Sequence, residues 1–169
     1  DIDHGITTIL RGEDHVTNSA AQIQLFEALG AKAPEMGHLA LLAGADGEGL
    51  SKRLGSLSIE ELRADGMEAS SIASLLSRIG TSDPIVPLAK MDDVIAGFDI
   101  ARFGRATAKF DPAELAFLNG KIVQQLEFTD VSDRLAGLGL DVSEAFWVAI
   151  RGNLTKISEA SHWYQIIYR

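Results

Sequence analysis

The segment at residues 47–56, GEGLSKRLGS, gathers phosphate-binding chemistry into one short loop. Lys52 and Arg53 are adjacent cations among glycines and serines, in a chain that carries more acidic than basic residues. Glycine gives such a backbone wide conformational freedom, and ammonium, guanidinium and hydroxyl groups are donors that suit phosphate oxygens. The segment predicts a phosphate-binding loop, with a solvated surface turn as the alternative.

A second polar group, at the end of the β-branched, apolar stretch of residues 5–12, is Arg11, Glu13, Asp14 and His15. That stretch predicts a buried strand, and ligands of open α/β sheets gather at the carboxyl ends of strands. His15 is predicted to hydrogen-bond in a pocket wall and not to bind metal, because no partner stands at ligand spacing.

A third group is basic. Arg102, Arg105 and Lys109 lie in a stretch with no acidic residue between Asp99 and Asp111. The net charge of −9 opposes long-range attraction to nucleic acid. Phosphate contacts need only a local patch, so this stretch predicts one, with a solubilising surface run as the alternative.

The first two groups need strands and a helix to position them. Residues 5–12 and 38–44 predict two short buried strands. Between them, Thr17 or Asn18 can cap a helix that runs to Leu29 and stops at a glycine. This order predicts a β–α–β unit in a parallel sheet.

After Ser56 the pattern is helical. Trp147, Trp163 and Tyr164 have helical spacing, which favours core packing over stacking on bases. The predicted helices start at Ser58 with Glu61 at capping-box spacing, within residues 67–80 and 91–98, at Asp111 with Pro112 in the first turn, at Thr129 and at Ser143.

The composition bounds the class of protein. The 169 residues are 46% hydrophobic and 23% charged, enough for a real core in one domain or two small ones. The absence of cysteine excludes a disulfide scaffold, a zinc ribbon and a cysteine nucleophile, and favours a reducing compartment such as the cytoplasm. No apolar run is long enough to span a bilayer, and the first residues carry no leader pattern.

Taken together, the motifs resemble the class I aminoacyl-tRNA synthetases and, within them, the glutamyl-tRNA synthetases. The resemblance runs through GITTILRGEDHVTNSAAQIQLFEALG, HLALLAGADGEGLSKRLGS and FDPAELAFLNGKIV, in the family's order. It implies an α/β remnant, the second half of a Rossmann-type catalytic domain, over residues 1–48. Residues 49–128 would form the KMSKS loop and a mainly helical stem-contact domain. Residues 129–169 would begin a helical anticodon-binding domain.

The same resemblance implies a ligase that activates glutamate as glutamyl-adenylate and transfers it to the 3′ end of tRNA. Its partners would be ATP, L-glutamate and tRNA, with Mg²⁺ held mainly by ATP phosphates, no zinc and no oligomer. The family's HIGH motif is missing, because residues 3–7, DHGIT, lead into a strand where HIGH opens a helix. We therefore expect a fragment that does not form the adenylate alone.

The resemblance also assigns roles to the loop. Leu50, Ser51, Lys52 and Arg53 would contact ATP, and Lys52 would be the catalytic cation that stabilises charge on the breaking triphosphate. The family usually has a basic residue where Gly49 stands, so only one of two cations is present.

Arg11 resembles the family's arginine that contacts the amino acid, since a guanidinium fork fits a carboxylate. A salt bridge to Glu13 or Asp14 is the alternative. These acids and His15 could equally orient Arg11 or contact the ribose or tRNA end.

Two other readings stay open. One is the related enzyme that glutamylates a modified tRNA base, which resembles only the catalytic part. The other is a non-catalytic helical module that binds tRNA or protein and carries a decayed nucleotide loop, which Gly49 and the missing HIGH motif favour.

Overall fold

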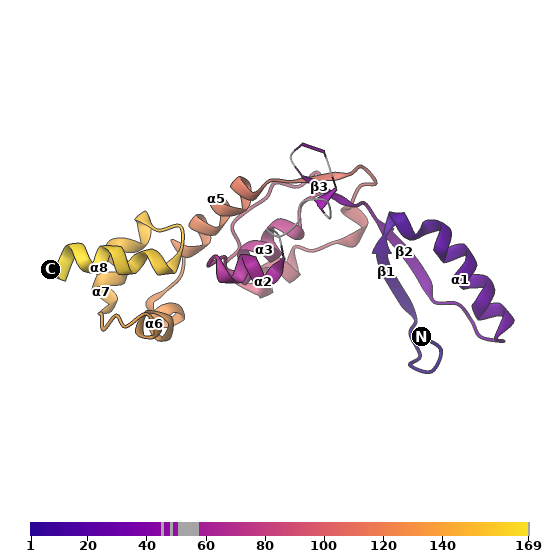
Figure 1. Cartoon of the computed structure of the whole chain (residues 1–169), viewed down its shortest axis with the longest axis horizontal. Coiled ribbons are helices and arrows are strands. Elements are labelled where there is room, and N and C mark those ends of the chain that lie inside the picture. The colour runs from indigo at the N-terminus through magenta and orange to yellow at the C-terminus, as the bar shows by residue number, and fades with distance from the viewer. Residues whose placement is uncertain (45, 48, 51–57, 169) are drawn as a thin grey trace.

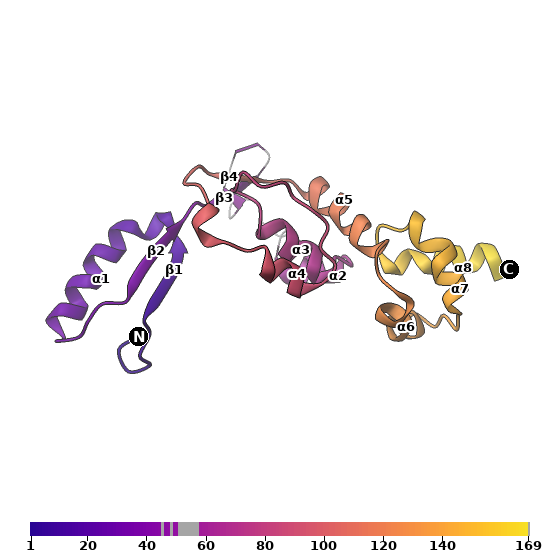
Figure 2. The ribbon, with the colours of Figure 1, turned by 180° about the vertical axis from the view of Figure 1, so that it is seen from behind.

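The structure is a computed structural model that describes residues 1–44, 46–47, 49–50 and 58–168. N-terminal, middle and C-terminal units follow one another in an arch, and the C-terminus lies at the far end from the first strand (Figure 1 and Figure 2). The strands are β1 (Thr8–Gly12), β2 (Glu35–Leu39), β3 (Leu42–Gly44) and β4 (Ala108–Phe110). The α-helices are α1 (Val16–Ala28), α2 (Ile59–Ala64), α3 (Ala69–Leu76), α4 (Met91–Ala96), α5 (Pro112–Val123), α6 (Phe128–Gly137), α7 (Glu144–Ile150) and α8 (Ala160–Tyr168).

The N-terminal unit confirms the predicted parallel β–α–β arrangement. The prediction that its strands are buried is wrong, because no residue of β1 or β2 is buried. β1 pairs with β2 in parallel, with Thr8 opposite Glu35 and Arg11 opposite His38, and α1 makes the crossover. A 3-10 turn at Glu13–His15 leads directly into α1. The predicted caps Thr17 and Asn18 are wrong, because α1 already begins at Val16, within the turn that leaves β1.

The predicted strand at residues 38–44 is wrong as a single element. Strand β2 pairs with β1 as far as Leu39. From Leu42 the chain forms a separate strand, β3, which pairs in parallel with β4. β4 itself lies in the region predicted to be helical. A continuous apolar run predicts an apolar segment, but it does not indicate which strand each part of that segment pairs with.

The middle unit has a core between α3 and α5. Leu75, Leu115 and Ile122 are essentially inaccessible to solvent. Two predicted helix starts are confirmed here: Ser58 and Glu61 form a reciprocal capping box, and Asp111 caps α5 with Pro112 in its first turn.

The C-terminal unit packs α6, α7 and α8 around Trp147, which is fully buried. Its indole Nε1 donates to the Leu126 carbonyl oxygen at 2.8 Å. Trp163 and Tyr164 pack against the same core, so the prediction of core packing is confirmed. The predicted start of a helix at Thr129 is off by one residue, because α6 begins at Phe128 and the Glu127 N–H is capped by Asp130.

Helix α5 belongs to both cores. Its Leu115 packs in the core of the middle unit and its Val123 in the core of the C-terminal unit. Asn119, fully buried between them, accepts from the Glu68 N–H at 2.7 Å and donates to the Thr155 carbonyl at 2.7 Å. The shared helix and this bridge join the two units.

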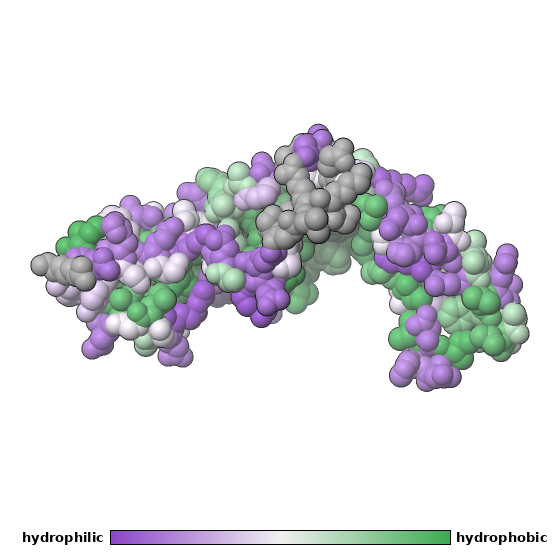
Figure 3. Space-filling view, viewed as in Figure 1, coloured by the Kyte–Doolittle hydropathy of each residue, from purple (hydrophilic) through white to green (hydrophobic). Residues whose placement is uncertain are grey.

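Hydrophobic surface is visible on each of the three units in Figure 3, including the N-terminal unit at the right. Leu10, Leu25 and Leu29 are 53%, 61% and 72% exposed there. Across the described part of the chain, none of the helices has the length and apolar character that crossing a bilayer requires.

Candidate functional site

Arg11 stands at the carboxyl end of β1 with its side chain turned toward α1. Its Nη1 donates to Gln22 Oε1 at 2.7 Å, and its Nη2 contacts Ser19 Oγ and Met36 Sδ, the latter at 3.4 Å. Among the described residues, Arg11 forms no salt bridge to Glu13 or Asp14, since its side chain bonds to neutral groups. The guanidinium charge is therefore left for another anion.

The Arg11 Nε is buried and has no hydrogen-bond partner among the described residues. An arginine has five N–H donors and no acceptor. A buried donor without an acceptor costs about 1–3 kcal/mol, so such a group calls for a functional or structural reason. No contact among the described residues supplies that reason for the Arg11 Nε.

Ser19 and His38 complete this group, which we call the Arg11 cluster: Arg11, Ser19, Gln22, Met36 and His38. Ser19 is 5% exposed, and its Oγ lies 3.0 Å from the His15 carbonyl oxygen and 2.6 Å from His38 Nε2. Sequence reasoning missed Ser19, Gln22, Met36 and His38. A parallel pairing of the two predicted strands would have placed His38 near Arg11, but only with the correct register.

Glu13, Asp14 and His15 are exposed on the turn before α1. His15 Nε2 lies 3.8 Å from Asp14 Oδ2, with both side chains about half exposed. A methyl group on Gly12 would fall against the Asp14 carboxylate and 2.8 Å from Leu41 Cδ2. The turn therefore passes close to the chain that leads into β3.

The predicted ATP-binding loop leaves the carboxyl end of β3. Gly47, with φ +83°, turns the chain, and Gly49 forms a bridge with Ala43. Leu50 is half-buried against the core of the middle unit. Ser51, Lys52 and Arg53 lie outside the described residues, so the position of the predicted catalytic cation stays a prediction.

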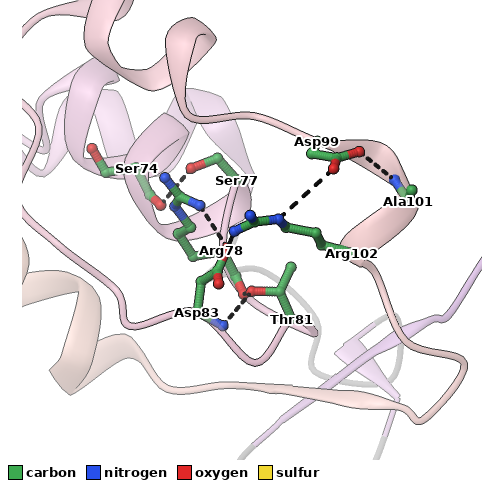
Figure 4. A network of polar contacts seen from close by, with 8 residues as sticks. All are labelled: Ser74, Ser77, Arg78, Thr81, Asp83, Asp99, Ala101 and Arg102. Carbon is green, nitrogen blue, oxygen red and sulfur yellow. Dashed lines mark hydrogen bonds and ion pairs between the residues drawn. The ribbon is translucent and has the colours of Figure 1, made fainter.

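Of the predicted tRNA contacts, Arg102 is held by acids (Figure 4). Its Nη1 donates to Asp83 Oδ2 at 2.6 Å, its Nε lies 3.7 Å from Asp99, and Arg78 donates to the same Asp83 oxygen at 2.8 Å. The hydrogen bond from Arg102 holds the pKa of Asp83 below its ordinary value, with Arg78 adding to the effect. Arg102 is thus fixed as part of a charge network.

Arg105 and Lys109 are exposed. Lys109 lies on β4 between the buried Ala108 and Phe110, so strand alternation turns it outward. Neither forms an ion pair with any other described residue. These two cations are available to an anionic surface.

A hollow of about 570 Å³ lies elsewhere in the N-terminal unit, lined in part by Thr8, Pro34 and Glu35. These residues are at the amino ends of β1 and β2, whereas Arg11 and His38 are at the carboxyl ends. The hollow is therefore separate from the Arg11 cluster.

Comparison with known protein families shows which family the chain belongs to. The model for the catalytic domain of class I tRNA synthetases (E and Q) matches residues 1–117. The chain belongs to this family. All the predicted site residues, from Arg11 to Lys109, fall within the matched segment.

Curated relatives of this synthetase family resemble the chain along its whole length. Glutamate–tRNA ligase 1 of Chelativorans sp. is 49% identical over 171 residues, covering 100% of this chain and 38% of the relative. Glutamate–tRNA ligase 2 of Sphingopyxis alaskensis is 51% identical over 166 residues, covering 98% of this chain and 37% of the relative. The chain thus spans well under half of the length of these ligases.

Solved structures of the same synthetase family share the fold. The glutamate–tRNA synthetase of Elizabethkingia anophelis superposes with a TM-score of 0.73 at 24% identity, over 98% of this chain and 38% of that one. A glutamate–tRNA ligase of Elizabethkingia meningosepticum, solved in complex with its amino acid, gives 0.74 at 23% identity over 96% of this chain. The mixed α/β architecture, rich in helix, is therefore that of the glutamyl synthetases.

Proposed function

We propose that this chain is part of a glutamate–tRNA ligase, which activates glutamate with ATP and transfers it to the 3′ end of tRNA. The observation that carries the proposal is the near-50% identity to curated glutamate–tRNA ligases along 98–100% of the chain. In this proposal the N-terminal unit is the second half of a Rossmann-type catalytic domain. The middle unit is the stem-contact domain, and the C-terminal unit begins the anticodon-binding domain.

Arg11 binds a carboxylate of glutamate in this proposal. Its contacts with Gln22 and Ser19 are to neutral partners and leave its positive charge unneutralised. A guanidinium pairs with a carboxylate through two parallel N–H···O bonds, which fixes the orientation of the substrate.

Lys52 acts on ATP in this proposal. The glutamate carboxylate attacks the α-phosphorus, the bond to the pyrophosphate oxygen breaks, and negative charge grows on the departing group. An ammonium positioned over that group stabilises the charge, most strongly where water is excluded. We assign Mg²⁺ to the ATP phosphates and water, because Mg²⁺ gives up its waters reluctantly and commonly binds through substrate phosphates.

The tRNA contacts fall to the basic segment. Arg105 and Lys109 are its exposed members, and Arg102 is its fixed member, held by Asp83 and Asp99. Phosphate contacts position a nucleic acid without reading its sequence, so a few cations are enough despite the net charge of −9.

The test is tRNA charging by the complete protein that contains this chain. We expect it to attach labelled glutamate to tRNA and to catalyse glutamate-dependent exchange of pyrophosphate into ATP, and we expect the isolated chain to do neither. Charging of tRNA by glutamate should fall by orders of magnitude in Lys52→Ala. Failure of the complete protein to charge tRNA would refute the proposal. Binding of tRNA without charging would favour the non-catalytic module, and glutamylation of a tRNA base would favour the base-modifying enzyme.

A further inference from the structure

The centre of the Arg11 cluster is a single hydroxyl group. Ser19 Oγ contacts Arg11 Nη2, His38 Nε2 at 2.6 Å and the His15 carbonyl oxygen at 3.0 Å, and the residue is 5% exposed. A serine hydroxyl has one proton to donate and two lone pairs to accept with. Its hydrogen-bonding capacity is therefore filled by these contacts.

This arrangement fixes the position of each proton. Arg11 can only donate, and the His15 carbonyl oxygen can only accept, so the hydroxyl proton of Ser19 points to His15. The remaining lone pair of Ser19 then accepts from His38. Only a His38 ring with its proton on Nε2 makes all of these contacts hydrogen bonds.

We propose that Ser19 and His38 are positioning residues for Arg11, which present its guanidinium fork to the glutamate carboxylate. The proposal rests on the proposed function, in which Arg11 binds glutamate. The register of β1 and β2 places His38 opposite Arg11, and α1 brings Ser19 over both. His38 holds the Ser19 hydroxyl, and Ser19 holds the Nη2 side of Arg11.

The benefit of such a device is preorganisation. An arginine side chain loses considerable rotamer entropy when it is ordered on binding. A guanidinium that is already held in the protein avoids part of that loss when the substrate arrives. Loss of the Ser19 hydroxyl should therefore weaken glutamate binding and leave ATP binding unchanged.

The experiment measures glutamate and ATP KM values in the pyrophosphate-exchange assay of the complete ligase. Ser19→Ala should raise the glutamate KM about tenfold, the equivalent of about 1.4 kcal/mol, while the ATP KM stays within twofold. Ser19→Thr, which keeps the hydroxyl, should restore the glutamate KM. His38→Phe should act like Ser19→Ala, and His38→Gln, which keeps an N–H near the Nε2 position, should act less strongly.

The matched control is Ser74→Ala in the middle unit. Ser74 is fully buried, and its Oγ donates to the Leu88 carbonyl at 3.0 Å, remote in sequence and in unit from Arg11. Ser74→Ala, like Ser19→Ala, removes a serine hydroxyl from a buried site, so this variant should be less stable but should keep the wild-type glutamate KM. An equal rise in glutamate KM in Ser74→Ala would mean that general destabilisation explains the effect and would overturn the proposal.

A second measurement needs no activity. In ¹⁵N-labelled isolated chain, NMR at a pH where the ring is neutral should show the His38 proton on Nε2, and a proton on Nδ1 alone would overturn the assignment. Because this NMR measurement uses the wild-type chain, it tests the hydrogen-bond assignment of His38 even if Ser19→Ala fails to fold. If the wild-type ligase charges tRNA but Ser19→Ala and His38→Phe keep the wild-type glutamate KM, the positioning role is refuted. If the wild type does not charge tRNA, the proposed function fails instead.

Discussion

Replacing Asn119 by alanine should uncouple the middle and C-terminal units. Asn119 is fully buried on α5, where its amide accepts from the Glu68 N–H and donates to the Thr155 carbonyl, both at 2.7 Å. The alanine variant leaves the Glu68 N–H and the Thr155 carbonyl without this side-chain partner. A typical hydrogen bond contributes about 0.5–1.5 kcal/mol, so the loss of two should lower the free energy of unfolding of the C-terminal unit by about 1–3 kcal/mol.

The assay is urea unfolding of the isolated chain followed by tryptophan fluorescence. The chain has two tryptophans, and both Trp147 and Trp163 belong to the core of the C-terminal unit, so the signal reports that unit. Asn153→Ala, at an exposed position, is the matched control and should change stability by less than about 0.5 kcal/mol.

Hydrogen exchange measures the effect of Asn119→Ala at the individual amide that it deprives of its partner. Within the described part of the chain, the Glu68 amide donates to Asn119 alone, so its exchange should accelerate in Asn119→Ala and not in Asn153→Ala. If Asn119→Ala unfolds within about 0.5 kcal/mol of the wild type and the Glu68 amide stays protected, the reasoning that Asn119 bridges the units is wrong.

Two further predictions concern charge and capping. Asp83 has a lowered pKa in the folded chain because Arg102, and secondarily Arg78, donate hydrogen bonds to it. Its stabilising contribution is therefore present above its unfolded pKa and is lost as the pH falls through the folded pKa. The wild type should be more stable than Asp83→Asn at neutral pH and approach it in acid, and a constant difference in thermal unfolding over that pH range would contradict this. Ser58→Ala removes the oxygen that accepts from the Glu61 N–H at 3.1 Å, which should lower the stability of α2 by about 0.5–2 kcal/mol. Faster hydrogen exchange in α2 would show this loss, and unchanged exchange there would mean that the capping box adds no stability.

The local features of this fold were predictable from the sequence because they depend on neighbours a few residues apart. The capping box of Ser58 and Glu61 needs only their spacing, and Asp111 with Pro112 marks the start of α5 in the same way. The β–α–β unit followed from the order of apolar runs and a glycine stop at Gly30, which has φ +73°.

The non-local features were not predictable in this way. The short strand β4 finds its partner β3 across more than sixty residues, and an apolar run such as residues 38–44 does not encode the change of partner after Leu39. The Arg11 cluster shows the same limit. Arg11 was identified from its motif, but Ser19 and His38 join it only through the register of β1 with β2 and the rotation of α1.

Arg11→Lys in the complete ligase tests the central claim most directly, because it keeps the charge and removes the guanidinium fork. The account predicts that the glutamate KM in pyrophosphate exchange rises at least about tenfold, the equivalent of about 1.4 kcal/mol or more, with the ATP KM unchanged. A glutamate KM equal to that of the wild type would contradict it, since Arg11 would then not be the residue that binds the amino acid.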